Sequence, residues 1–236
     1  MEKKIQNDFL RGMFNGIPIF LGYLSVSFGF GIMAVSSGLS VFEAFMISLT
    51  NLTSAGQAQG VVVIASGGTL IEMALVQFVI NIRYALMALS LSQKLDKKFT
   101  LPHRLLAAYG ITDEIFALCS TKENILKPNY MYGVIAVSTF GWVLGTFLGG
   151  AAGTLLPANV TSALGIVLYG MFIAIIIPPI RKHKNILFVV GIAALFSVIC
   201  KYLLPFISGG FAVIISAIIA AVLGALIFPQ KDGENE

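Results

Sequence analysis

The chain has 236 residues, of which 57% are hydrophobic and only 11% are charged, and its mean hydropathy is +0.91. Soluble domains carry about 25% charged residues, so this composition excludes a soluble protein whose folded surface faces water. The formal net charge of +4 is small, and no basic stripe is interleaved with aromatic residues, which argues against a nucleic-acid partner. The composition indicates an integral membrane protein whose surroundings are the lipid bilayer.

Eight apolar segments follow one another along the chain. They lie at about 13–36, 41–66, 68–92, 104–120, 131–150, 160–180, 186–204 and 207–228. These runs are continuous rather than alternating, so they predict membrane helices and not the strands of a barrel. The first run contains Pro18 and lacks a small-residue cleavage site, so we read it as a retained helix rather than a signal peptide. We expect an all-α, polytopic helical bundle that forms a single transmembrane domain over residues 1–236, with tails at 1–12 and 229–236.

The basic residues fall into four short tracts between the apolar runs. These tracts are the N-terminal tail with Lys3, Lys4 and Arg11, and residues 94–104, 122–127 and 181–184. Lysine and arginine prefer cytoplasmic loops, so all four tracts, and with them both termini, are expected in the cytoplasm. Three apolar segments separate the first two tracts, so one of the three should enter and leave on the same side.

The interrupted segment 41–66 is the best candidate for that partial crossing, and the short segment 104–120 is a second one. Six full crossings plus these two partial ones then satisfy every basic tract. Eight full crossings, with the charge rule broken at some loops, are the alternative count.

The stretch NLTSAGQAQG (51–60) places many polar residues inside an apolar run. A broken or re-entrant helix here would expose amide N–H groups that attract an anionic group and carbonyl groups that attract a cation. We expect Gly56 and Gly60 to allow the turn, while Gln57 and Gln59 supply neutral donors and acceptors. This combination suits an uncharged or zwitterionic solute. The alternative is that these side chains only form hydrogen bonds between helices.

Arg83 lies deep in its apolar segment, about a dozen residues after the segment begins. A charge at this depth is costly and marks a functional candidate. Gln77 and Asn81 share another face of the same helix. Two roles stay open for Arg83: an ion pair with Asp113 or Glu114 that locks helices together, or direct contact with a solute or ion. Glu43, Glu72 and Lys201 lie near segment ends, where a solvated interface is expected.

Asp113 and Glu114 follow Thr112 in the stretch YGITDEIFAL. In a soluble protein the three residues would read as a helix start, with a cap at Thr112 or Asp113. In an apolar setting, a desolvated carboxylate takes up a proton more readily, as proton-coupled transport requires.

Gly141, Gly145, Gly149 and Gly153 repeat every four residues and leave one helix face without side chains. Another backbone can approach this face closely, whether from this chain or from another subunit. Cys119 and Cys200 are expected to be small buried side chains. We predict no metal site and no cofactor.

Four motifs in a fixed order resemble the AzlC family, the larger subunits of bacterial branched-chain amino acid exporters. The motifs are GIPIFLGYLSVSFGFG (16–31), SAGQAQ (54–59), VINIRYALMALSLS (79–92) and YGITDEIFAL (109–118). The family pattern falls on Pro18, Gly22, Phe28, Gly29, Ala55, Gly56, Gln57, Asn81, Arg83, Tyr84, Leu86, Thr112, Asp113 and Glu114. The likeness covers the first half of the chain in detail and the second half in hydropathy only. Tyr84 departs from the histidine found in many members.

The resemblance implies a secondary transporter that exports branched-chain or similar amino acids across the bacterial inner membrane. It also implies a small hydrophobic partner subunit of the AzlD type. The substrate-binding residues would be Ala55, Gly56, Gln57, Gln59, Asn81, Arg83, Phe28 and Gly29. Asp113 or Glu114 would pair with Arg83, meet the ammonium group or carry the coupling proton. Phe28, Phe30 and Met33 would offer an apolar wall for an aliphatic side chain.

Two other classes of protein compete with a transporter. A channel would show flux that does not saturate at low solute concentration, and a structural subunit would not be stabilised by any solute. An enzyme is not expected. Aspartyl intramembrane proteolysis needs two facing membrane aspartates, and Asp113 is the one aspartate of the sequence inside an apolar segment. A Ser–His dyad is not expected either, because both histidines flank loops.

Overall fold

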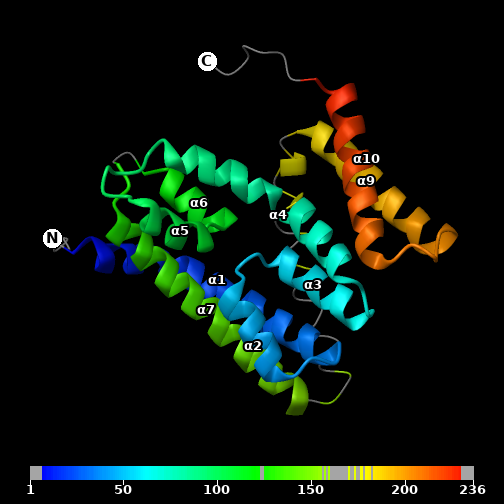
Figure 1. Ribbon diagram of the computed structural model, residues 1–236, viewed down its shortest axis with the longest axis horizontal. Helices are drawn as coiled ribbons and strands as arrows, with labels where there is room; N and C mark the ends of the chain where they lie inside the picture. Colours follow the sequence, from blue (N-terminus) through cyan, green and yellow to red (C-terminus); the bar gives the residue numbers. More distant parts are fainter. Residues whose placement is uncertain are drawn as a thin grey trace. The chain divides into compact units, whose positions relative to one another are not determined.

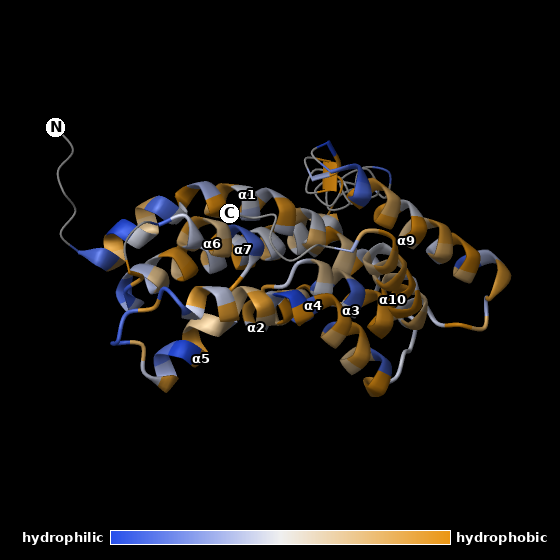
Figure 2. Cartoon of the chain, turned by 90° about the horizontal axis from the view of Figure 1, so that it is seen from above, coloured by the Kyte–Doolittle hydropathy of each residue, from blue (hydrophilic) through white to orange (hydrophobic). Residues whose placement is uncertain are grey.

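The computed structural model describes residues 7–122, 125–155, 157, 159, 170, 173, 176–177, 179–181 and 183–229. Its helices are α1 (Asp8–Ser36), α2 (Val41–Thr50), α3 (Ala55–Ala65), α4 (Leu70–Ser92), α5 (Leu101–Tyr109), α6 (Asp113–Ser120), α7 (Pro128–Leu155), α9 (Lys184–Leu203) and α10 (Gly209–Ile227). Within the described ranges, five of them are long and apolar enough to cross a membrane: α1, α4, α7, α9 and α10. This confirms the predicted helical membrane fold, and Figure 2 shows that α9 and α10 consist largely of hydrophobic residues.

Both segments that were predicted to cross only partly are broken into two short helices. The first becomes α2 and α3, separated by residues 51–54, and the second becomes α5 and α6, separated by residues 110–112. The predicted crossing at 160–180 lies almost wholly outside the described residues.

The chain divides into two compact units. Unit 1 contains residues 1–58 and 80–168, and unit 2 contains residues 59–79 and 169–236. Unit 1 therefore holds α1, α2, α5, α6 and α7, with the first turn of α3 and the second half of α4.

In unit 1, α1 and α7 pack against each other along their lengths, and Figure 1 shows them side by side. A Cβ added at Gly12 would approach the backbone of Tyr130, and one added at Gly149 would approach the backbone of Phe28. Contacts therefore advance in the same direction along both helices, so the two run parallel. The glycine face of α7 thus has its partner within this chain, because α1 covers it.

The α2 helix begins at the opposite end of unit 1 from the start of α1 and runs toward the middle. Val41 lies near Gly150 at the end of α7, and the ring centroids of Phe45 and Phe147 are 6.5 Å apart. Ser40 and Glu43 form a capping box that starts the helix. The exposed position of Glu43 agrees with the predicted solvated interface.

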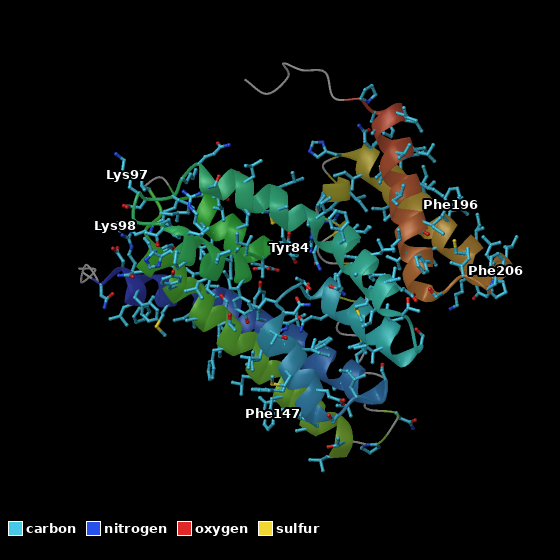
Figure 3. The ribbon with its side chains drawn as sticks, viewed as in Figure 1. Tyr84, Lys97, Lys98, Phe147, Phe196 and Phe206 are labelled. Carbon is cyan, nitrogen blue, oxygen red and sulfur yellow. The ribbon has the colours of Figure 1, made fainter. Side chains whose placement is uncertain are left out.

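Three of the four basic tracts meet at one end of unit 1. The Lys127 ammonium group lies 2.9 Å from the Asp8 carboxylate, and this carboxylate raises the pKa of Lys127 by hydrogen bonding and attraction. Leu95 and Leu126 form an isolated parallel bridge, and the Asp96 amide donates to the Leu126 carbonyl at 2.9 Å. Lys97 and Lys98 lie at this same end in Figure 3. We call it the basic end of unit 1.

The common location of these tracts agrees with the prediction that one of the first three apolar segments crosses only partly. The basic end contains the start of α1, the end of α4 and the start of α7. After α1, α2, α3 and α4 the chain has therefore returned to the end at which α1 began. The α5–α6 pair also starts and finishes there, as expected of a hairpin that enters and leaves on one side.

In unit 2, α9 and α10 pack antiparallel, with Phe188 near the start of α9 stacked edge-on against Phe228 after α10. Glu72 of α4 is only 3% exposed. Its carboxylate accepts hydrogen bonds from the Ser208 hydroxyl and from the Gly210 amide. The prediction of a solvated Glu72 is therefore wrong: the carboxylate binds the N-terminus of α10, whose exposed amides favour an anion.

Candidate functional site

The first helix break lies at residues 51–54. Asn51 leaves the helix in an extended conformation, and its side-chain oxygen accepts a hydrogen bond from the Thr53 amide at 3.1 Å. Ser54 has a φ of 41°, in the left-handed region. The break was predicted correctly, but the expectation that Gly56 and Gly60 make the turn is wrong. An asparagine-mediated turn makes it instead, and both glycines lie inside α3.

A row of buried polar groups extends from this break to α7. The Gln57 amide nitrogen donates to the Ser48 hydroxyl at 3.0 Å, and Ser48 is 2.7 Å from the Thr146 hydroxyl. Thr146 donates to the Trp142 carbonyl at 3.0 Å. Because each hydroxyl carries one hydrogen, Ser48 must donate to Thr146, so every bond in the row runs in one direction.

Among the described residues, three side chains of this region keep a buried polar atom without a hydrogen-bond partner: Thr53 in the break itself, Gln57 and Trp142. The Gln57 side-chain oxygen and the Trp142 indole N–H are buried and have no hydrogen-bond partner among the described residues. The two residues are only 1% and 2% exposed. An unpaired buried polar group costs about 1–3 kcal/mol. The region therefore has a spare acceptor and a spare donor for a polar guest.

The second helix break ends at Thr112, which caps α6. Its hydroxyl accepts from the Ile115 amide at 3.3 Å. The Tyr23 hydroxyl lies 2.6 Å from the Thr112 hydroxyl and 2.6 Å from the Glu114 carboxylate. The helix start predicted at Thr112 or Asp113 is thus confirmed, with Thr112 as the cap. The cap nevertheless lies against α1 rather than at the basic end.

The two breaks meet near the middle of α1. The Tyr109 hydroxyl, at the end of α5, donates to the Leu49 carbonyl near the end of α2 at 2.6 Å. Tyr23 packs with Leu52 and Trp142, and the Tyr23 and Trp142 rings are 5.1 Å apart and nearly perpendicular. Tyr23 lies about 22 Å along a helix of about 43 Å, at 1.5 Å per residue. Interrupted helices that meet at this depth are typical of secondary transporters.

Arg83 forms the ion pair that was one of its two predicted roles. Its Nη1 atom lies 2.9 Å and 3.2 Å from the two Asp113 carboxylate oxygens. Its Nη2 atom donates to the Tyr84 hydroxyl at 3.2 Å. Tyr84 is labelled in Figure 3 in the middle of unit 1. The side chains of Arg83 and Asp113 are 41% and 32% exposed, so the pair stays accessible.

The other predicted site residues are distributed more widely. Ala55, Gly56 and Gln57 lie in the first turn of α3, while Gln59 belongs to unit 2. The backbone of Phe28, next to Gly29, packs on Gly149, so this part of α1 contributes to the α1–α7 contact. Asn81 lies in the part of α4 that belongs to unit 1.

Sequence reasoning missed four residues that the structure places beside the breaks. These are Tyr23, Ser48, Trp142 and Thr146. Three of the four could have been noticed in the sequence. Ser48 and Thr146 are small polar residues inside apolar runs, and Trp142 is the single tryptophan of the chain.

Comparisons with known proteins agree with this architecture. The model of the family described as AzlC protein matches residues 18–156. An uncharacterized membrane protein of Archaeoglobus fulgidus is 31% identical over 96% of both chains. The inner membrane protein YgaZ of Escherichia coli is 26% identical over 93% of this chain and 90% of its own length.

A functionally named relative also matches. The branched-chain amino acid transport protein AzlC of Bacillus subtilis is 26% identical over 72% of this chain and 66% of its own length. No solved structure matches the chain. With the family match covering more than half of its residues, the chain belongs to the AzlC family of membrane proteins.

Proposed function

We propose that the protein is a secondary transporter that exports branched-chain or similar amino acids and couples their movement to protons. The name of the Bacillus subtilis relative supports the substrate class. The observation that carries the proposal is the meeting of two interrupted helices in unit 1, with an unpaired acceptor at Gln57 and an unpaired donor at Trp142. A zwitterion offers both complementary groups.

The start of α3 would receive the carboxylate of the amino acid. Helix N-termini favour anions, and Ala55 begins this helix, while the Gly56 amide next to it donates to the Thr53 carbonyl at 3.1 Å. Gln57 would contribute its free side-chain oxygen to the ammonium group. Asn81 of unit 1 would line the path to the site, and Phe28 would form part of an apolar wall.

The charged residues would act around the second break. Arg83 would hold Asp113 in place through their ion pair. When this ion pair opens, Arg83 would bind the carboxylate of the solute. Glu114 or Asp113 would meet the ammonium group or carry the coupling proton. We propose no cofactor and no catalytic residue for this transport.

We further propose a small AzlD-type membrane subunit as partner, and the bacterial inner membrane as location, with both termini in the cytoplasm. The shared position of three basic tracts at one end of unit 1 supports this orientation, since cytoplasmic loops are rich in lysine and arginine.

The test is uptake of labelled leucine, isoleucine, valine and methionine into inverted vesicles, with and without the partner and a pH gradient. Saturable uptake that the gradient increases is expected. Arg83→Ala and Asp113→Asn should both lose it. Flux that never saturates would indicate a channel instead, and wild-type transport by both variants would remove the assigned roles.

A further inference from the structure

The two carboxylates at the start of α6 have different surroundings. Asp113 faces a guanidinium group, with Arg83 Nη1 at 2.9 Å. Glu114 has no salt bridge among the described residues, and its partner is the neutral Tyr23 hydroxyl at 2.6 Å. A proton added to Asp113 would leave Arg83 without its counter-charge. A proton added to Glu114 separates no ion pair.

The hydrogen bonds around Glu114 can be satisfied in both protonation states. When Glu114 is ionised it only accepts, so Tyr23 donates to it and the Thr112 hydroxyl donates to Tyr23. When Glu114 is protonated, it donates to the Tyr23 oxygen, and Tyr23 donates to Thr112. The three oxygens stay paired in either order. The added proton stays on Glu114, the Tyr23 and Thr112 hydroxyls each keep their own hydrogen and only rotate, and Tyr23 is never left as a phenolate.

We propose that Glu114 is the residue that binds the coupling proton, that Tyr23 and Thr112 form the relay that accommodates it, and that Asp113 stays ionised against Arg83. This inference rests on the proposed transport function and selects between the two carboxylates of that site. Net uptake of one proton at the Glu114 carboxylate from one side, and its release to the other, accounts for the coupling.

The charged and titratable groups around Glu114 come from three helices. Tyr23 comes from α1, Arg83 and Tyr84 from α4, and Asp113 from α6. Of these described groups, Arg83 is the cation and is held by Asp113, and Tyr23 and Tyr84 are neutral phenols. From α7, the neutral ring of Trp142 packs on Tyr23.

Protonation also changes how the hairpin of α5 and α6 is held. A hydrogen bond to a charged carboxylate is about twice as strong as one between neutral groups. Tyr23 therefore holds the hairpin tip more firmly when Glu114 is ionised. Proton binding loosens the contact between the tip and α1, at the place where the two helix breaks meet.

The fluorescence of Trp142 can report proton binding at Glu114. Trp142 is the only tryptophan of the sequence, and its ring centroid lies 5.1 Å from that of Tyr23. The emission of Trp142 in the purified protein is expected to change with pH in one step. Glu114→Gln should abolish the step. Glu43→Gln, at an exposed capping carboxylate, should leave it unchanged.

Transport gives the second readout, using wild-type protein and Glu114→Gln in proteoliposomes with labelled leucine. Leucine exchange by Glu114→Gln should no longer depend on pH, and a pH gradient should drive no accumulation. Gradient-driven accumulation at the wild-type level would overturn the proposal. If the variant moves no leucine at all, the emission step decides: its persistence in Glu114→Gln would overturn the proposal, and its loss would support it. Failure of the wild type to exchange any amino acid would instead refute the proposed function.

Discussion

Substitution of Gly149 by alanine tests the packing that positions the site. A Cβ at Gly149 would overlap the Phe28 carbonyl oxygen and lie 2.7 Å from its carbonyl carbon and 2.8 Å from its Cα atom. Carbon atoms in contact are about 3.5–4.0 Å apart, so α1 and α7 must separate by about 1 Å. Backbone atoms cannot rotate away, so the cost lies near the upper end of the usual 1–3 kcal/mol for overpacking.

Alanine also favours the helix over glycine by about 1 kcal/mol, which leaves a net loss of about 2 kcal/mol. For a chain of this size that lowers the melting temperature by about 4–8 °C. Thermal unfolding in detergent measures it. Gly22→Ala in α1 is the matched control, because nothing lies within 4 Å of its added Cβ, and it should raise stability. Equal melting temperatures for the two variants would refute the close packing of α1 on α7.

Three further predictions use the same unfolding assay or hydrogen exchange. A double-mutant cycle of Arg83→Met and Asp113→Asn should give a coupling energy of about 1–2 kcal/mol, between the values for exposed and buried pairs; a value near zero would contradict the ion pair. Glu72→Gln should cost about 1.5–3 kcal/mol, as hydrogen bonds to a charged group do, and should speed amide exchange at Gly210, whereas unchanged exchange there would count against the contact. Lys127→Met should lower stability at pH values where Asp8 is ionised and Lys127 is charged, and the difference should vanish as the pH rises through the raised pKa of Lys127, because its ion pair is lost there; a pH-independent difference would contradict this.

Hydropathy and charge were enough to predict the membrane class, the helical elements and both interrupted segments. The polar stretch at 51–60 stands out because irregular backbone inside a membrane protein needs a polar or protein-lined environment. The turn itself was assigned to the wrong residues. Glycine permits a turn, but Asn51 and Ser54 make it through a side-chain hydrogen bond and a left-handed φ.

Contacts between distant segments could not be predicted from one sequence. Ser48 and Thr146 are 98 residues apart, and nothing in either local pattern indicates that they meet. Glu72 looked like an interface residue because it lies near a segment end. Its burial depends on the start of α10, which is 136 residues away at Ser208. The ion pair of Arg83 was foreseen as an alternative, because a deep cation needs an acid and few acids were available.

The central claim is that an amino acid binds where the two interrupted helices meet, beside Gln57 and Trp142. Leucine titrated into the purified protein, with the emission of its single tryptophan recorded, tests this claim most directly. We predict a saturable change in emission that is lost in Gln57→Leu. An emission that stays constant while leucine reaches concentrations that saturate transport would contradict the account, because the solute would then bind elsewhere.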